Sequence, residues 1–545
     1  MRPNSGPGLV ERAGESPGRR RPRLDYLIAA LILALLLLEG PHTIHAVGIS
    51  WDEPVYFPLA KNYLAWAKNL GSPGAFSAET LEQVFGLNPD YYQHPSLTKI
   101  LPALTMAALE RRMGKFWAYR MSAPILFGLL LAALYLRVAP VWGRRAGLAA
   151  ALCLAAMPRF FVEGHIAATD APLSAFWFLC AWAFEAACSR RRLAPLAGIA
   201  YGLLMSVKFS GFLIPVPLIV WGMIYRRRTM LWPTLALVAL GPLTFILLQP
   251  GAWYHPLAAP LLFIQRSASG EVWGRVWSVF LGQYYVFSPP WYYAPFLVLV
   301  TTPVLTLTLF LVGVIQAGRG RFRDPLAGSG LLHFGFFMAL TMAPNAPLFD
   351  GVRLFLPVLV FLAVLAGSGF DSVVEWMADR MQGLGHARRF TAVLTGLLAV
   401  SLVIPLLRIY PYGLEYYNAL IGGVKGARER GMVTTYWWTV VTEDTLAQIN
   451  RTLPAGAVLS FFPMDPELWN LYRELGLLRS DLRVTEDSDF DYLLMLSRPF
   501  WNCELTFKGV GVPIYRLNPI ASLVVDQVPF WVLYQKPPQA PLPPP

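Results

Sequence analysis

Two adjacent carboxylates, Asp52 and Glu53, follow the first membrane-length apolar run of the chain, in the segment Ile49-Ser50-Trp51-Asp52-Glu53-Pro54. A carboxylate just beyond a helix end, at a membrane surface, suits a base that meets a lipid-borne substrate and a second substrate arriving from water. The simpler interpretation is a solvated turn or a helix cap. Trp51 and Pro54 favour a rigid turn anchored at the interface, which shifts the balance only modestly toward a catalytic pair, so both interpretations stay open at this point.

Further charged residues are expected on the same side of the membrane as this pair. Opposite charges there suit a reaction in which phosphate departs from an anionic lipid while a hydroxyl is deprotonated. Structural alternatives stay open: Asp170 precedes a helix and fits an N-cap, and Lys208 fits a lysine that snorkels to the headgroups. Arg353 could pair with Asp350, and His94 fits a structural hydrogen-bonding residue. The predicted cluster contains Asp170, Lys99, Lys208 and Arg353.

Composition predicts a polytopic α-helical membrane protein. Of 545 residues, 55% are hydrophobic and 14% are charged, whereas soluble domains carry about a quarter charged residues. Apolar runs of near-spanning length predict about eleven transmembrane helices. Their approximate cores are 24–40, 120–139, 146–163, 170–188, 194–209, 211–225, 231–249, 295–315, 329–343, 353–370 and 390–407.

The net charge of +12 comes from arginine clusters in every second loop between apolar runs. This placement follows the positive-inside rule and excludes the contiguous basic face of a nucleic-acid-binding protein. The N-terminus is therefore predicted to be cytoplasmic, and the acidic pair and the C-terminus to lie outside. Cysteine and histidine show no metal-ligand spacing, so no cofactor is predicted, and a divalent metal is left open without being indicated.

The chain divides into a membrane module and a small outer domain. Mixed polarity and short β-like runs after residue 430 predict an extracytoplasmic α/β domain. Its expected strands are 457–462, 491–496 and 522–534, with a helix near 466–478. The predicted organisation is a disordered basic tail (1–23), a membrane module (24–430) whose first outer loop (40–119) has surface helices near 56–70 and 97–114, the α/β domain (431–536) and a Pro-rich tail (537–545).

The order of these elements resembles the C-type (GT-C) membrane glycosyltransferases, in the bacterial protein O-mannosyltransferase and aminoarabinose-transferase branch. The resemblance covers roughly residues 24–430, and it departs from the family pattern at Ser96 and Thr98 and in the C-terminal domain. It is carried by Trp51-Asp52-Glu53, His94-Pro95-Ser96-Leu97-Thr98-Lys99, Tyr119–Pro124, Ala168–Leu173, Gly202–Gly211, Pro289–Tyr293, Phe349–Pro357 and Tyr416–Gly423.

The resemblance implies a GT-C fold and metal-independent, inverting sugar transfer from a polyprenyl-phosphate carrier to an acceptor outside the cytoplasm. The acceptor could be a protein hydroxyl, a glycolipid or a polysaccharide. Asp52 would be the general base, Glu53 would orient the substrates and Asp170 would support the cavity. Lys99, Arg120, Lys208 and Arg353 would hold the lipid phosphate, and His94, Trp291 and Tyr292 would line the acceptor and sugar cavity. The resemblance also implies a multi-pass protein of the bacterial inner membrane.

Two functions of other classes remain as alternatives. A transporter or flippase would move lipid-linked sugars without covalent chemistry, but such proteins usually have internal repeats with broken helices in matching positions. No such repeat is visible in the sequence. A non-catalytic scaffold that binds a partner through the C-terminal domain would leave the clustered charges unexplained.

Overall fold

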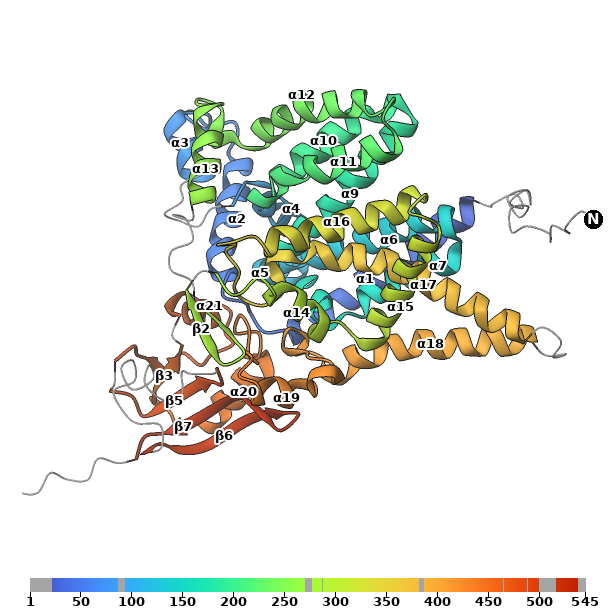
Figure 1. The fold of residues 1–545 in the computed structure, drawn as a ribbon. Coiled ribbons are helices and arrows are strands. Elements are labelled where there is room, and N and C mark those ends of the chain that lie inside the picture. The colour runs from blue at the N-terminus through green and yellow to red at the C-terminus, as the bar shows by residue number, and fades with distance from the viewer. Residues whose placement is uncertain are drawn as a thin grey trace, which may run out of the picture.

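The protein, studied as a computed structural model, is described over residues 22–86, 94–269, 277–286, 288–381, 387–463, 465–487, 489–498 and 516–537. The predicted tails therefore lie almost entirely outside the described residues. A helical module makes up most of the molecule, and a mixed sheet packs at one end of it (Figure 1). The start of α1 and the junction between α6 and α7 lie at the opposite end of the module (Figure 1).

Within the described residues, six helices are long and apolar enough to cross a membrane, which confirms a polytopic helical protein. All eleven predicted apolar cores overlap helices, and the exact number of spans stays a prediction. These six spans correspond to α1 (Pro22–Ala46), α6 (Ser122–Trp142), α9 (Asp170–Ser189), α12 (Leu231–Leu248), α17 (Pro357–Arg380) and α18 (Ala387–Ile409). Shorter helices of the module are α7 (Arg144–Ala155), α8 (Pro158–Glu163), α10 (Ala194–Met205), α11 (Pro215–Tyr225), α14 (Tyr293–Thr301), α15 (Val304–Arg319) and α16 (Pro325–Thr341).

Two runs that were predicted to be continuous are broken, and prolines mark both breaks. The run 146–163 divides into α7 and α8 before Pro158, and the run 295–315 divides into α14 and α15 with a bend of 115°. Proline has no N–H group to continue the ladder. At the second break the Asn418 amide donates 2.7 Å hydrogen bonds to the carbonyls of Leu299 and Thr302. Backbone groups freed by the bend thus regain partners.

Four helices fill the long loop after α1: α2 (Glu53–Lys68), α3 (Ala78–Phe85), α4 (Leu97–Met113) and α5 (Lys115–Arg120). The predicted helices 56–70 and 97–114 are confirmed as helices by α2 and α4. Between α12 and α14 the chain forms α13 (Ala258–Ser269) and an antiparallel hairpin of β1 (Trp277–Phe280) and β2 (Gln283–Val286).

The C-terminal domain is built on a five-stranded mixed sheet in the order β4-β3-β5-β7-β6. Strands predicted at 457–462 and 491–496 are confirmed, whereas the single strand predicted at 522–534 is wrong. That run is a hairpin, because Asp526 and Gln527 form a two-residue turn at φ 50° and 63°. The elements are α19 (Gly423–Glu429), α20 (Glu443–Thr452), β3 (Val458–Phe462), α21 (Pro466–Glu474), β4 (Arg483–Val484), β5 (Tyr492–Leu496), β6 (Asn518–Val525) and β7 (Val528–Gln535).

The C-terminal domain shares one apolar core with the helices of the first loop. Phe57 of α2 and Tyr119 of α5 belong to the same buried cluster as Trp438, Trp469 and Trp531. Because core packing is rigid, this shared cluster fixes the domain against the loop that follows α1. The segment that carries Asp52 is therefore held between the helical module and the C-terminal domain.

Candidate active site

Four charged side chains from distant parts of the sequence meet at the junction of the helical module and the C-terminal domain. Asp52 lies at the N-cap position of α2, and Asp170 is the first residue of α9. Lys208 Nζ lies 2.5 Å from Asp170 Oδ1. Arg353 lies between the two carboxylates, with Nη2 3.3 Å from Asp52 Oδ2 and Nε 3.4 Å from Asp170 Oδ2. The structure thus brings together four of the residues proposed from the sequence.

The structure argues against the purely structural roles considered for Asp170 and Lys208, and it supports the pairing of Arg353 with Asp350. Thr169, not Asp170, occupies the N-cap position of α9, and the Asp170 side chain makes no capping hydrogen bond. Lys208 is 6% exposed and pairs with Asp170, so it does not snorkel to the membrane surface. Arg353 Nη1 does approach Asp350, at 3.6 Å. Arg353 is therefore shared among three carboxylates.

Several buried polar atoms in this region make no hydrogen bond. Arg353 Nε and Nη1 and Asp170 Oδ2 lie within ion-pair distance of opposite charges, yet without hydrogen-bond geometry. Leaving a buried polar group unpaired costs on the order of 1–3 kcal/mol, so such groups call for an explanation. Other buried side-chain atoms that make no hydrogen bond are Ser50 Oγ, Thr169 Oγ1, Glu163 Oε2 and Ser210 Oγ. The arrangement fits a site that completes its hydrogen bonds with a ligand.

The pKa of Asp52 is raised above its ordinary value. Burial is the largest cause, and the anions Asp170 and Asp350 add to it, while Arg353 and Lys208 act in the opposite direction. The Asp52 side chain nevertheless keeps 16% exposure. A carboxylate with a raised pKa is a stronger base, and an exposed oxygen can reach a substrate hydroxyl.

Glu53 and Arg120 form a separate, closed pair. Arg120 Nε lies 2.7 Å from Glu53 Oε1, and Arg120 Nη2 lies 2.9 Å from Glu53 Oε2. Arg120 also donates to the carbonyls of Ile44, Val47 and Gly48, and both side chains are fully buried. The structure therefore does not bring Glu53 or Arg120 to the Asp52 cluster, and their geometry fits a structural pair.

Lys99 and His94 lie close to the cluster but face other partners. The Lys99 ammonium donates to the carbonyls of His94 and Pro95, and burial lowers the pKa of Lys99 to about 7. Burial, followed by the charges of Lys208, Lys99 and Arg353, lowers the pKa of His94. His94, with its lowered pKa beside the cations, fits a wall of the site. Lys99 fits the role of a phosphate ligand less well, because its ammonium already donates to two carbonyls.

Trp291 and Tyr292 are not brought to the cluster. They are 61% and 39% exposed, and their rings pack against each other at 5.6 Å. The next residue, Tyr293, is buried, and its hydroxyl accepts a 3.3 Å hydrogen bond from Gly351 in the turn before Arg353. Within the aromatic run Pro289–Tyr293, the contact with the turn before Arg353 thus comes from Tyr293.

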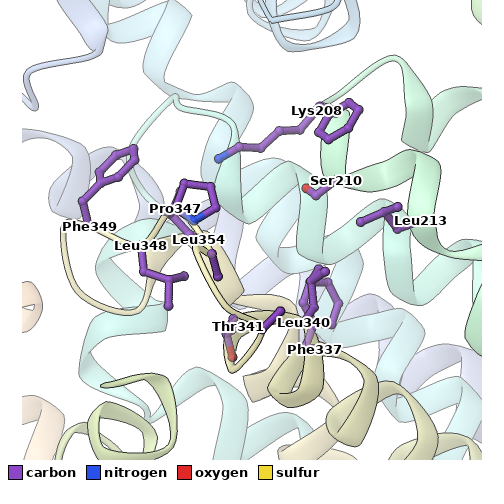
Figure 2. A pocket seen from close by; sticks show the side chains of 13 residues that line it. Lys208, Ser210, Leu213, Phe337, Leu340, Thr341, Pro347, Leu348, Phe349 and Leu354 are labelled. Atoms are coloured by element: carbon purple, nitrogen blue, oxygen red, sulfur yellow. The ribbon is translucent and has the colours of Figure 1, made fainter. Parts of the chain in front are cut away.

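An apolar cavity of about 260 Å³ adjoins Lys208. Lys208 and Phe349 lie toward one side of it, and Leu340, Phe337 and Thr341 lie toward another (Figure 2). Leu340 is 37% exposed, so the apolar lining reaches the surface of the helical module. The cavity is lined by Lys208, Phe209, Ser210, Leu213, Phe337, Leu340, Thr341, Ala343, Ala346, Pro347, Leu348, Phe349 and Leu354.

Comparison with known proteins identifies the fold. The structure of ArnT from Cupriavidus metallidurans in the apo state matches with a TM-score of 0.51 and 16% identity, over 95% of this chain and 100% of that one. The chain therefore has the same fold as this ArnT structure. A family model described as dolichyl-phosphate-mannose-protein mannosyltransferase also matches residues 93–254, which include Lys99, Asp170 and Lys208.

Two further GT-C structures align less closely. ArnT from C. metallidurans bound to undecaprenyl phosphate gives a TM-score of 0.49 at 15% identity, over 94% of this chain and 99% of that one. The Archaeoglobus fulgidus oligosaccharyltransferase gives 0.47 at 13% identity, over 86% and 64% of the two chains. No curated protein matches this chain in sequence.

Proposed function

We propose that this protein is an inverting glycosyltransferase that moves a sugar from a polyprenyl-phosphate carrier to a hydroxyl on an extracytoplasmic acceptor. The observation that carries the proposal is the Asp52–Arg353–Asp170–Lys208 cluster beside an apolar cavity. One carboxylate with a partly exposed side chain supplies a base, two cations supply a phosphate site, and the cavity suits isoprene units. The match to the mannosyltransferase family model supports a polyprenyl-phosphate donor.

In the proposed reaction Asp52 takes the proton from the acceptor hydroxyl. The hydroxyl oxygen attacks the anomeric carbon of the sugar on the face opposite the phosphate, and this attack inverts the configuration. The bond between that carbon and the phosphate oxygen breaks, and the lipid phosphate leaves with the electron pair. Lys208 and Arg353 stabilise the negative charge that develops on the leaving oxygen.

Binding of the lipid phosphate would complete the hydrogen bonds of the site. Arg353 Nε and Nη1 are buried donors without hydrogen bonds, and Lys208 stands at the cavity wall. A phosphate oxygen can accept from such donors and compete with Asp170 for Lys208. The charges of the site thus need no metal ion to bind the carrier, and metal-independent transfer is part of the proposal.

The proposed location is the bacterial inner membrane, with the site on the extracytoplasmic side. Arg144, from one of the arginine clusters, forms an ion pair at 2.6 Å with Asp25 at the start of α1. This end of the module is opposite the C-terminal sheet (Figure 1). The positive-inside rule makes the arginine-rich end cytoplasmic and the sheet end extracytoplasmic.

The test uses the full chain in liposomes, supplied with radiolabelled polyprenyl-phosphate sugars (mannosyl, glucosyl and arabinosyl) and a membrane extract as the source of acceptors. The expected result is label released from the carrier and found in covalent linkage on an acceptor. Asp52→Asn should abolish this transfer. Asp371→Asn is the control, because it removes a carboxylate paired with Arg145 at 3.0 Å, away from the cluster.

The opposite result separates the proposal from a flippase. If label crosses the bilayer but stays on its carrier with every donor, the protein moves lipid-linked sugars and the enzymatic proposal fails. Full transfer by Asp52→Asn would leave the enzyme class intact and overturn the assignment of the base.

A further inference from the structure

Two consecutive tryptophans adopt left-handed backbone conformations beside the cluster. Trp437 has φ 53° and Trp438 has φ 64°, and both side chains are buried. Bulky residues rarely adopt positive φ, because the side chain then crowds the backbone. Backbone strain of this kind persists where contacts in the surrounding structure require it.

The two side chains have different partners. The guanidinium carbon of Arg353 lies 3.8 Å from the centroid of the Trp437 ring, whereas Trp438 packs on Trp51 at 4.3 Å. A cation held on an indole face away from water is attracted to the ring, and the stack fixes the orientation of the planar guanidinium. Trp437 thus restrains Arg353, which contacts Asp52 and Asp170 together.

The same segment also holds the turn that carries Asp52. The carbonyl of Trp437 accepts a 3.2 Å hydrogen bond from the Trp51 N–H, and the carbonyl of Thr439 accepts one from Gly48 N–H at 3.2 Å. A Cβ atom at Gly48 would lie 2.5 Å from the Thr439 carbonyl oxygen, so the two backbones are in close contact. Trp437 therefore contacts the cation through its ring and the segment of the base through its backbone.

We propose that Trp437 is a positioning residue of the transfer site, whose indole face sets the place of Arg353 relative to Asp52. The inference rests on the proposed function. It also gives the C-terminal region, predicted to begin at residue 431, a direct part in the site.

The electrostatic consequence has a definite sign. Arg353 opposes the burial that raises the pKa of Asp52, so displacing Arg353 should raise that pKa further. The base acts when deprotonated, and the acid limb of the pH–rate profile should then move to higher pH. The charged or titratable groups that act on or respond to Asp52 are Arg353, Asp170, Asp350, Lys208, Glu163, Tyr56 and Tyr119.

The experiment compares Trp437→Leu, Trp437→Phe and Trp438→Leu in the full chain in liposomes, with whichever labelled polyprenyl-phosphate sugar the wild type transfers. Trp437→Leu should lower kcat about 10- to 100-fold and move the acid limb to higher pH. Trp437→Phe keeps an aromatic face, so its kcat and its acid limb should stay closer to those of the wild type. Trp438→Leu is the matched control, since it alters an adjacent, equally strained tryptophan that does not stack on Arg353. Its acid limb should stay at the wild-type pH.

An acid limb that stays in place in Trp437→Leu, or that moves equally in Trp438→Leu, would overturn the inference. Should Trp437→Leu fail to fold, Trp437→Phe still decides, because the weaker ring should give a smaller shift to higher pH and an unmoved limb contradicts the proposal. Absence of transfer by the wild type with every donor counts against the proposed function, which makes the two failures distinguishable.

Discussion

Asp52 and Glu53 are neighbours in sequence, yet they belong to two charged clusters of opposite character. Glu53 accepts four hydrogen bonds, from Arg120 Nε and Nη2 and from the backbone N–H groups of Ser50 and Ala167. Asp52 instead contacts a cation that it shares with two other carboxylates, at distances of 3.3–3.6 Å. One cluster is complete by itself, and the other holds buried donors without hydrogen bonds.

The difference indicates that the Glu53–Arg120 pair serves stability, whereas the cluster around Asp52 and Arg353 serves binding and chemistry. A closed, fully hydrogen-bonded ion pair fixes the entry into α2, because Arg120 also donates to three carbonyls at the end of α1 and just after it. An incomplete cluster costs stability and gains from a ligand that carries the missing charge.

The largest effect is expected on stability, from Glu53→Gln. Neutralising Glu53 leaves the Arg120 guanidinium buried without its counter-charge, which should lower the free energy of unfolding by about 3–5 kcal/mol. Denaturant titration in detergent, followed by tryptophan fluorescence, measures the change. A loss below about 1 kcal/mol would mean that the closed cluster is not a structural pair.

The next effect is expected on the donor, from Lys208→Met. Removing the cation at the cavity wall should lower kcat/KM for the polyprenyl-phosphate sugar about 10²- to 10³-fold, since a charged donor to the leaving phosphate is lost. Lys99→Met is the matched control, because Lys99 is also buried but donates to carbonyls of its own turn. Steady-state kinetics with varied donor compares the two. Equal losses in both variants would contradict the assignment of Lys208 to the lipid phosphate.

The smallest effect is expected on the pH profile, from Asp350→Asn. The Asp350 anion raises the pKa of Asp52, so its removal should move the acid limb of kcat/KM to lower pH. This direction is opposite to that expected for Trp437→Leu. Measuring both profiles in one buffer series checks the sign, and a shift of Asp350→Asn to higher pH would show that the charges around Asp52 are wrongly assigned.

Hydropathy and arginine placement were enough to predict much of this molecule. Apolar runs located the helices, and the positive-inside rule predicted that Asp52, Asp170, Lys208 and Arg353 lie on one side of the membrane. The structure brings these four side chains together. These signals are local or additive along the chain. They do not depend on how a side chain is oriented.

Orientation was what the sequence could not supply. Adjacent positions at a helix start point in different directions, so the pair Asp52-Glu53 gave no sign that Glu53 binds Arg120 instead of substrate. The role of Trp437 could not be predicted, because local propensity argues against a tryptophan at positive φ and tertiary contacts override that preference. The aromatic run Tyr436-Trp437-Trp438 was the available signal.

The most direct test of the account measures turnover per folded molecule for Asp52→Asn and Glu53→Gln side by side. The account predicts that Asp52→Asn keeps its unfolding midpoint and loses at least about 10²-fold in kcat, as expected for a general base. Glu53→Gln should lose stability while its folded fraction turns over at the wild-type rate. A normal rate for folded Asp52→Asn, or a comparable loss for folded Glu53→Gln, would contradict the division between the two residues.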